Sequence, residues 1–201
     1  MRILAVSDIE AKYYYDYYTP GKLDGFDMIL ACGDLCREYL EFLVTMARCP
    51  VVYVRGNHDK RFAEFPPEGC VCADGRVVVV NGVRILGLGG SYRYKSGKFM
   101  YTEREMRLRV CKALLSIRKH KGFDILLTHA PARHINDCDN LTHRGFECFG
   151  VLLDKYKPKY FVHGHVHMNY GSRVPRKTVR GDTTIINAYD HYAFEYGEPR
   201  P

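Results

Sequence analysis

Short apolar runs recur along the chain and predict buried β-strands. Each run is three or four residues long and rich in β-branched or aliphatic side chains, which is the pattern of a strand covered on both faces. The predicted strands span residues 3–6, 28–31, 51–54, 125–127, 160–162 and 184–186. Two further runs, 77–80 and 83–88, flank Asn81-Gly82. They predict a hairpin, because a type I′ turn needs positive φ at both central positions.

Apolar residues spaced three and four apart lie between these strands and predict three helices. Their apolar positions are Tyr39, Leu40, Leu43, Val44 and Ala47 in the first helix, Met106, Val110, Ala113, Leu114 and Ile117 in the second, and Phe146, Phe149, Leu153 and Tyr156 in the third. The first and third must end before Pro50 and Pro158, because a proline ring does not fit a helix interior. Thr102 and Glu105 form a capping box that opens the second. The alternation of predicted strands and helices, together with the hairpin, predicts an α/β protein with mixed sheets. We expect it to form one domain over residues 1–201.

The composition is that of an ordinary globular chain. Of the 201 residues, 46% are hydrophobic and 26% are charged, and no apolar run approaches the ~20 residues of a membrane span. Asp8 interrupts the N-terminal apolar run too early for a secretory signal, and the eight cysteines include no pair of CxxC motifs. We therefore expect a cytoplasmic protein with reduced thiols and no membrane association. The net charge of +7 favours anionic ligands.

Polar residues with metal-binding side chains follow the predicted strands. They are Asp8 and Glu10 after the first strand, Asp34 after the second, Asn57, His58 and Asp59 after the third, His129 after the fourth, and His165 and His167 after the fifth. Ligand sites of open α/β sheets gather at such strand ends. This mixture of carboxylates, imidazoles and a carboxamide suits divalent first-row metals and is too rich in nitrogen for calcium or magnesium alone.

The order of these residues resembles the signature of the calcineurin-like metallophosphoesterases. That signature runs DxH, GD, GNH with a following acid, a lone His, and GHxH; the chain carries these blocks at 8–10, 33–34, 56–59, 129 and 164–167, with Glu10 in place of the first His. The resemblance implies a four-layer α-β-β-α sandwich, in which two mixed sheets are flanked by helices, and a two-metal site at the strand ends. His143-Arg144-Gly145-Phe146 and Tyr170-Gly171 resemble the small single-domain phosphodiesterase branch.

The resemblance also implies roles for the individual residues. Asp8 and His167 would hold the first metal, Asp34 would bridge both metals, and Asn57, His129 and His165 would hold the second. His58 would face the phosphate and protonate the leaving alkoxide, and Asp59 would orient it. Two cations acidify a shared water, and the resulting hydroxide attacks phosphorus.

Glu10 departs from the family pattern and leaves two alternatives open. In the first, it has lost ligation and the first metal site is weak. In the second, its carboxylate is itself a ligand, which favours manganese or iron(II) over zinc because carboxylates are harder donors than imidazoles. The survival of Asp8 and His167 favours the second alternative.

Several other residues have both a functional and a structural interpretation. Arg37, His143 and Arg144 are candidates to contact the phosphate, or else lie on solvated surfaces. His163 is either a further ligand or a core histidine. The tyrosines at 13–15 and 17–18 either stack on an aromatic part of a substrate or cover the core. Arg173, Arg176, Lys177 and Arg180 form either a solvated face or a nucleic-acid patch.

These observations predict a dimetal-dependent hydrolase of small anionic phosphate esters, with phosphodiesters preferred. A nuclease on the same scaffold is one alternative, disfavoured because no second domain is evident to hold a polymer. A non-catalytic scaffold is another, since the family includes a coat subunit that uses the fold as an interaction surface. The retention of His58 and of six of the seven expected ligands disfavours it.

Overall fold

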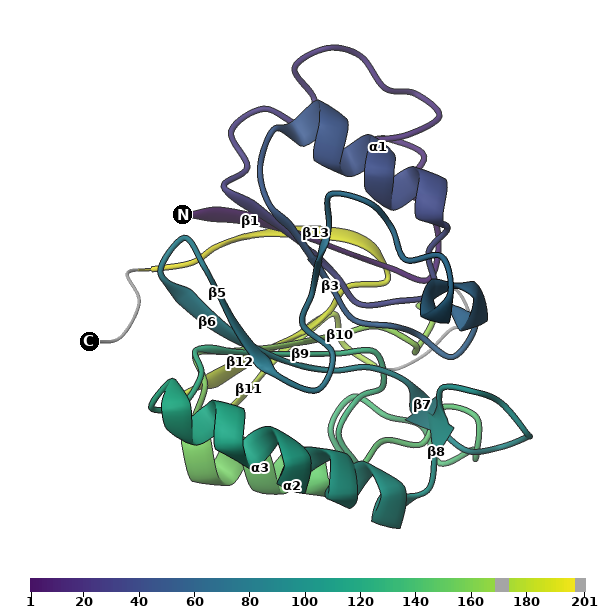
Figure 1. Cartoon of the computed structure of the whole chain (residues 1–201), viewed down its shortest axis with the longest axis vertical. Helices are drawn as coiled ribbons and strands as arrows, with labels where there is room; N and C mark the ends of the chain where they lie inside the picture. The colour runs from purple at the N-terminus through teal and green to yellow at the C-terminus, as the bar shows by residue number, and fades with distance from the viewer. Residues whose placement is uncertain (169–173, 198–201) are drawn as a thin grey trace.

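Two mixed β-sheets lie face to face in the computed structural model of the chain, which describes residues 1–168 and 174–197 (Figure 1). The first sheet has the strand order β13-β1-β2-β3-β4. Its strands are β1 (Arg2–Ser7), β2 (Met28–Ala31), β3 (Val51–Tyr53), β4 (Val71–Cys72) and β13 (Asp190–Glu195). Neighbouring strands are parallel except for β13, which runs antiparallel to β1.

The second sheet has the order β11-β12-β10-β9-β6-β5. Its strands are β5 (Val77–Val80), β6 (Val83–Leu88), β9 (Ile125–Thr128), β10 (Tyr160–His163), β11 (Lys177–Arg180) and β12 (Thr183–Asn187). The four central strands are parallel, and β5 and β11 close the two edges as antiparallel partners. Two short strands, β7 (Ser91–Tyr92) and β8 (Met100–Tyr101), pair separately.

Helices cover the outer faces of the two sheets. Helix α1 (Arg37–Ala47) lies over the first sheet, and α2 (Glu103–Lys119) and α3 (Glu147–Tyr156) lie over the second (Figure 1). A 3₁₀ turn, Lys60–Ala63, follows β3. One apolar cluster fills the space between the sheets, and one lies beneath the helices on each side. The expected four-layer α-β-β-α sandwich is therefore confirmed.

Most of the predicted elements are present at the predicted positions. Asn81 and Gly82 have φ of 50° and 77°, as the hairpin requires, and the Thr102–Glu105 capping box opens α2. The sequence analysis missed β11 and β13, whose residues are mostly half-buried or exposed. Such edge strands lack the continuous apolar run that marks a strand covered on both faces.

None of the helices in the described residues has the length and apolar character needed to cross a bilayer. All eight cysteines are free thiols.

A buried ion pair joins β6 to the residue that precedes β9 within the second sheet. The guanidinium of Arg84 on β6 donates to both carboxylate oxygens of Asp124 at 2.7 and 2.9 Å. The Asp124 side chain is fully buried, and Arg84 is 19% exposed. Burial raises the pKa of Asp124, but the hydrogen bonds and charge of Arg84 outweigh it, so the net pKa lies below the ordinary 3.8. The stabilisation that the ionised Asp124 provides is therefore fully present above about pH 3.8, and it is lost as the pH falls through the lowered pKa.

We expect Asp124→Ala to lower the free energy of unfolding by about 3 kcal/mol, because it leaves the Arg84 charge without its partner. Urea denaturation followed by circular dichroism measures the change. The matched control is Asp154→Ala, which removes an exposed ion pair with Arg180 and should cost less than about 1 kcal/mol. Equal losses for the two variants would contradict a special role for the buried pair.

Candidate metal centre

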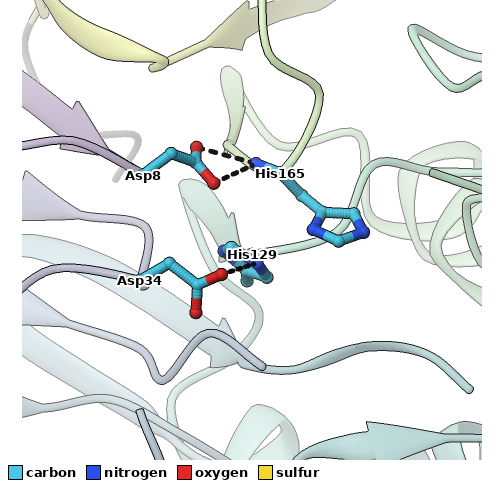
Figure 2. Close-up of side chains that lie close together, drawn as sticks. All are labelled: Asp8, Asp34, His129 and His165. Carbon is cyan, nitrogen blue, oxygen red and sulfur yellow. Dashed lines mark hydrogen bonds and ion pairs between the residues drawn. The ribbon is translucent and has the colours of Figure 1, made fainter. Parts of the chain in front are cut away.

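Four side chains from both sheets converge at the carboxyl ends of their strands. Asp8 follows β1, Asp34 lies after β2, His129 follows β9 and His165 lies after β10. One ligand atom from each lies within 4.8 Å of those of the other three. In Figure 2 the two carboxylates from the first sheet face the two histidines from the second. The cluster therefore sits at the seam between the sheets.

The backbone at this seam adopts conformations that cost energy. Asp8, Asp34 and His165 have φ of 70°, 55° and 66°, in the left-handed region that non-glycine residues rarely occupy. Each such residue costs about 1 kcal/mol or more. A Cβ at Gly56 would overlap the Asp34 carboxylate, and one at Gly164 would overlap the Ser7 side chain. Strain at three residues of one side-chain cluster points to a functional site, because it contributes nothing to stability.

Asp8 is held in its ionised form. Its side chain is 1% exposed, and its two oxygens accept hydrogen bonds from the backbone N of His165 at 3.2 and 2.9 Å. The Nε2 atom of His167 lies 3.6 Å from Oδ1. Burial raises the pKa of Asp8, but the His167 contact and the charge of His129 bring it below its ordinary value. The same contact raises the pKa of His167.

Asp34 is central to the cluster. Its Oδ1 accepts a hydrogen bond from the backbone N of His58 at 2.7 Å, and its Oδ2 lies 3.3 Å from Nε2 of His129. Burial raises the pKa of Asp34, but the charge and hydrogen bond of His129 outweigh it and lower the pKa to about 2. Burial lowers the pKa of His129, yet Asp34 raises it to about 9. The two side chains therefore form an ion pair.

Hydrogen bonds to backbone carbonyls fix which histidine nitrogen faces the cluster. Nδ1 of His129 lies 2.8 Å from the carbonyl oxygen of Cys32, and Nε2 of His165 lies 2.7 Å from that of Thr142. A carbonyl only accepts, so these nitrogens carry the hydrogens. Metal-ligating histidines are oriented in this way. Burial and the charge of His129 lower the pKa of His165 to about 3, so Nδ1 of His165 offers a lone pair at neutral pH.

The distances fit shared coordination. Two donors each about 2.1 Å from one metal lie at most about 4.2 Å apart. Nε2 of His129 is 3.3 Å from Asp34 and 3.0 Å from Oδ1 of Asn57. Nε2 of His167 is 3.6 Å from Asp8. The donor chemistry and the spacing therefore both fit divalent first-row metals.

An open cavity of about 400 Å³ lies over the cluster. Its lining consists of Asp8, Asp34, Asn57, His58, Tyr94, Thr142, His143, His165 and His167. His58 has a side chain that is 64% exposed, with Nε2 3.9 Å from Asp34. Nδ2 of Asn57 is 3.5 Å from the hydroxyl of Tyr94. The cavity thus gives a ligand direct access to the cluster and to His58.

Two of the expected site residues make contacts other than those expected. The Glu10 carboxylate accepts a hydrogen bond from the backbone N of Cys36, the N-cap residue of α1, at 3.0 Å, and Glu10 is outside the four-residue cluster. Asp59 accepts from the backbone N of Gly56 and of Asp34 at 2.7 and 3.0 Å. The described residues include no hydrogen bond between Asp59 and His58. Asp59 therefore joins the loops after β2 and β3 instead of holding the His58 ring.

The two candidate arginines contact groups outside the four-residue cluster. Arg37 pairs with Glu41 and Glu68 at 2.6 and 2.9 Å, and Arg144 lies over the ring of Tyr92 at 5.1 Å. Neither lines the cavity. His143, the third candidate, does line it, and burial together with His167 lowers the pKa of His143.

The tyrosine-rich segment mostly covers the core beneath α1. Tyr14 is buried there, and Tyr15 and Tyr18 pack against its edge. Both of the latter rings contact Phe42 of α1, at centroid distances of 5.0 and 5.2 Å. None of these tyrosines lines the cavity.

His163 is a fully buried core histidine, and burial lowers its pKa to about 4. In the basic stretch, Arg176 donates to backbone carbonyls of the β12–β13 region, and Arg180 pairs with Asp154. The structural interpretation thus fits His163, Arg176 and Arg180. Tyr170, Gly171 and Arg173 lie outside the described residues.

The sequence analysis missed Tyr94 and Thr142 as site residues. Tyr94 lies between β7 and β8, and Thr142 lies in the loop between β9 and α3. Neither follows a predicted strand, so no strand-end pattern marked them. Only the path of the two loops over the cavity brings these residues to the cluster.

Known proteins resemble this chain in sequence and in fold. The UPF0046 protein K07C11.7 of Caenorhabditis elegans is 25% identical over 94% of this chain and 69% of its own length. A second worm protein, UPF0046 protein C25E10.12, is 35% identical over 32% of this chain and 24% of its own length. The crystal structure of TT1561 from Thermus thermophilus superposes with a TM-score of 0.64 at 16% identity, covering 94% of this chain and 89% of that one. This last likeness shows the fold.

The family profile described as calcineurin-like phosphoesterase matches residues 1–169. This match includes all four residues of the candidate metal-binding cluster. The chain therefore belongs to the calcineurin-like phosphoesterase family.

Proposed function

We propose that this protein is a dimetal-dependent phosphodiesterase. The observation that carries the proposal is the convergence of Asp8, Asp34, His129 and His165 beneath an open cavity that also exposes His58. Asp34, Asn57, His129 and His165 would hold one metal, and Asp8, Asp34 and His167 would hold the other. Bound metals would offset the charge of the ester and lower the pKa of a water.

The protein's own residues supply the remaining functions. Asp34 faces both halves of the cluster and is the residue positioned to join them. Asp59 fixes the loop that carries Asn57 and His58 by bonding Gly56 and Asp34. His58 is exposed at the cavity wall, where it can donate a proton to a leaving alkoxide.

The charge of the cavity supports a diester substrate. Among the described lining residues there is no lysine or arginine. A phosphomonoester carries close to two negative charges at neutral pH, because its second pKa is about 6, whereas a diester carries one. A cavity whose only cations are metals is better matched to the less charged diester.

Glu10 is left out of the proposed ligand set because its carboxylate is bonded at the start of α1. The expected preference for manganese or iron rested on that carboxylate. Without it, the donors are three imidazoles, two carboxylates and one carboxamide. This set suits several first-row metals, so manganese, iron(II) and zinc are to be compared directly.

We also propose that residues 1–201 form one domain, since both sheets share the apolar cluster between them. A nuclease remains the second candidate within the same chemistry. The contacts of Arg176 and Arg180 with this chain's own groups argue against a basic polymer-binding face.

The proposed activity predicts metal-dependent hydrolysis of bis(4-nitrophenyl) phosphate with a higher kcat/KM than 4-nitrophenyl phosphate. The assay uses metal-depleted protein resupplied with manganese, iron(II) or zinc. If no metal-loaded form hydrolysed any ester in a broad panel, the proposed enzymatic activity would be refuted. DNA binding that weakens as salt rises, with unchanged cleavage of the small diester, would separate polymer binding from catalysis.

Substitutions of His58 and Asp34 should separate catalysis from metal binding. We expect His58→Ala to lower kcat by at least about 100-fold with metal content intact, because a general acid acts in the transition state. Asp34→Asn should lose metal and activity together, because it removes a charge shared by both centres. Elemental analysis alongside steady-state kinetics measures both. If His58→Ala lost its metal and Asp34→Asn kept it, the roles of His58 and Asp34 would be misassigned.

Glu10→Gln should leave the metal content unchanged, because the amide oxygen can still accept the hydrogen bond from Cys36. Removing the carboxylate charge at the start of α1 should cost at most about 1 kcal/mol of stability. Elemental analysis and urea denaturation measure these quantities. Loss of one metal from Glu10→Gln would instead show that Glu10 is a ligand.

A further inference from the structure

The two halves of the cluster differ in their nitrogen donors. In the proposed ligand set, His129 and His165 both serve the half that contains Asn57, and Nε2 of His129 lies 3.0 Å from Oδ1 of Asn57. The other half has one imidazole, His167, beside Asp8. The Glu10 carboxylate is instead hydrogen-bonded to Cys36. Any further donor to the Asp8 half must therefore come from another segment that reaches the cavity.

The loop between β9 and α3 carries an imidazole whose tautomer is fixed by a neighbouring side chain. The side-chain oxygen of Asn140 accepts from the backbone N of His143 at 2.8 Å and lies 3.0 Å from its Nδ1. A backbone amide only donates, which identifies the Asn140 atom as the oxygen; that oxygen must then accept a hydrogen from Nδ1. Nε2 of His143 is left with its lone pair, and none of the described residues is hydrogen-bonded to it.

This orientation resembles that of the histidines already placed in the cluster. In His129 and His165 one ring nitrogen is also hydrogen-bonded to a backbone carbonyl oxygen, and the other nitrogen faces the cluster. Such outer hydrogen bonds are the usual way in which a protein fixes the ring and tautomer of a metal ligand. Asn140 provides the corresponding contact for His143.

The ring positions allow His143 to share a metal with His167. A coordinated imidazole has its ring centroid roughly 3.2 Å from the metal, so two rings on one metal lie at most about 6.4 Å apart. The His143 centroid is 6.4 Å from that of His167 and 5.4 Å from that of His165. The 6.4 Å separation of the His143 and His167 rings lies at this limit. His143 also lines the same cavity as Asp8.

We infer that His143 is a ligand of the metal held by Asp8 and His167, oriented by Asn140. This inference rests on the proposed two-metal site and adds a donor from a loop that follows no strand-end pattern. A divalent first-row cation bound there would have two imidazoles and two carboxylates. The competing role for His143 is contact with the substrate, and metal binding measured without substrate distinguishes the two.

The test measures metal stoichiometry and affinity with manganese as the probe. Wild-type chain should bind two Mn²⁺ ions, and His143→Ala should retain one after dialysis, by elemental analysis. Asn140→Ala should weaken the affected site by about 10–100-fold, as loss of an outer hydrogen bond does, by titration with electron paramagnetic resonance of free Mn²⁺. Asn140→Asp keeps an oxygen acceptor and should bind nearly as the wild type does.

His134 provides a matched control on the same loop. It is exposed and does not line the cavity, and asparagine tolerates its φ of 62°, so His134→Asn should bind two ions. Two conditions would overturn the inference: a folded His143→Ala that keeps both ions at wild-type affinity, or a wild-type chain that binds one. Hydrolysis by the wild type tests the proposed function separately, so the two failures are distinguishable.

Discussion

The confinement of Asp8 and Asp34 to one buried seam is the constraint on which the site depends. Two carboxylates of like sign would raise each other's pKa in a region with little water. The chain offsets this with donors aimed at both: the backbone N of His165 for Asp8, and the backbone N of His58 with His129 for Asp34. Both acids therefore stay ionised and can attract cations.

The four-layer fold brings these donors together. Parallel strands of each sheet end at the same edge, and the apolar cluster between the sheets brings those two edges to one seam. The left-handed backbone at Asp8, Asp34 and His165 then turns the side chains into that seam. Close approach of the neighbouring loops requires glycine at positions 56 and 164. The strained backbone lowers the stability of the protein locally but places the donor side chains in the cluster, as is common at functional sites.

Two loops add side chains to the site beyond those that follow the strands. The β7–β8 loop contributes Tyr94, and the β9–α3 loop contributes Thr142 and His143. Thr142 uses its backbone carbonyl to orient His165, and Asn140 orients His143. One short segment thus touches both halves of the cluster, which is why its histidine becomes a candidate ligand.

The sequence by itself determined the layers and the strand-end cluster. Apolar runs predict strands because burial on both faces requires them, and the polar residue after each run marks the edge where ligands gather. Edge strands β11 and β13 escaped prediction because they are only partly buried. The contacts of Glu10, Arg37 and His143 were decided by the tertiary structure. A charged side chain takes the partner that is nearest in space, and the distance from Glu10 to Cys36, or from Arg37 to Glu68, exists only once the chain has folded.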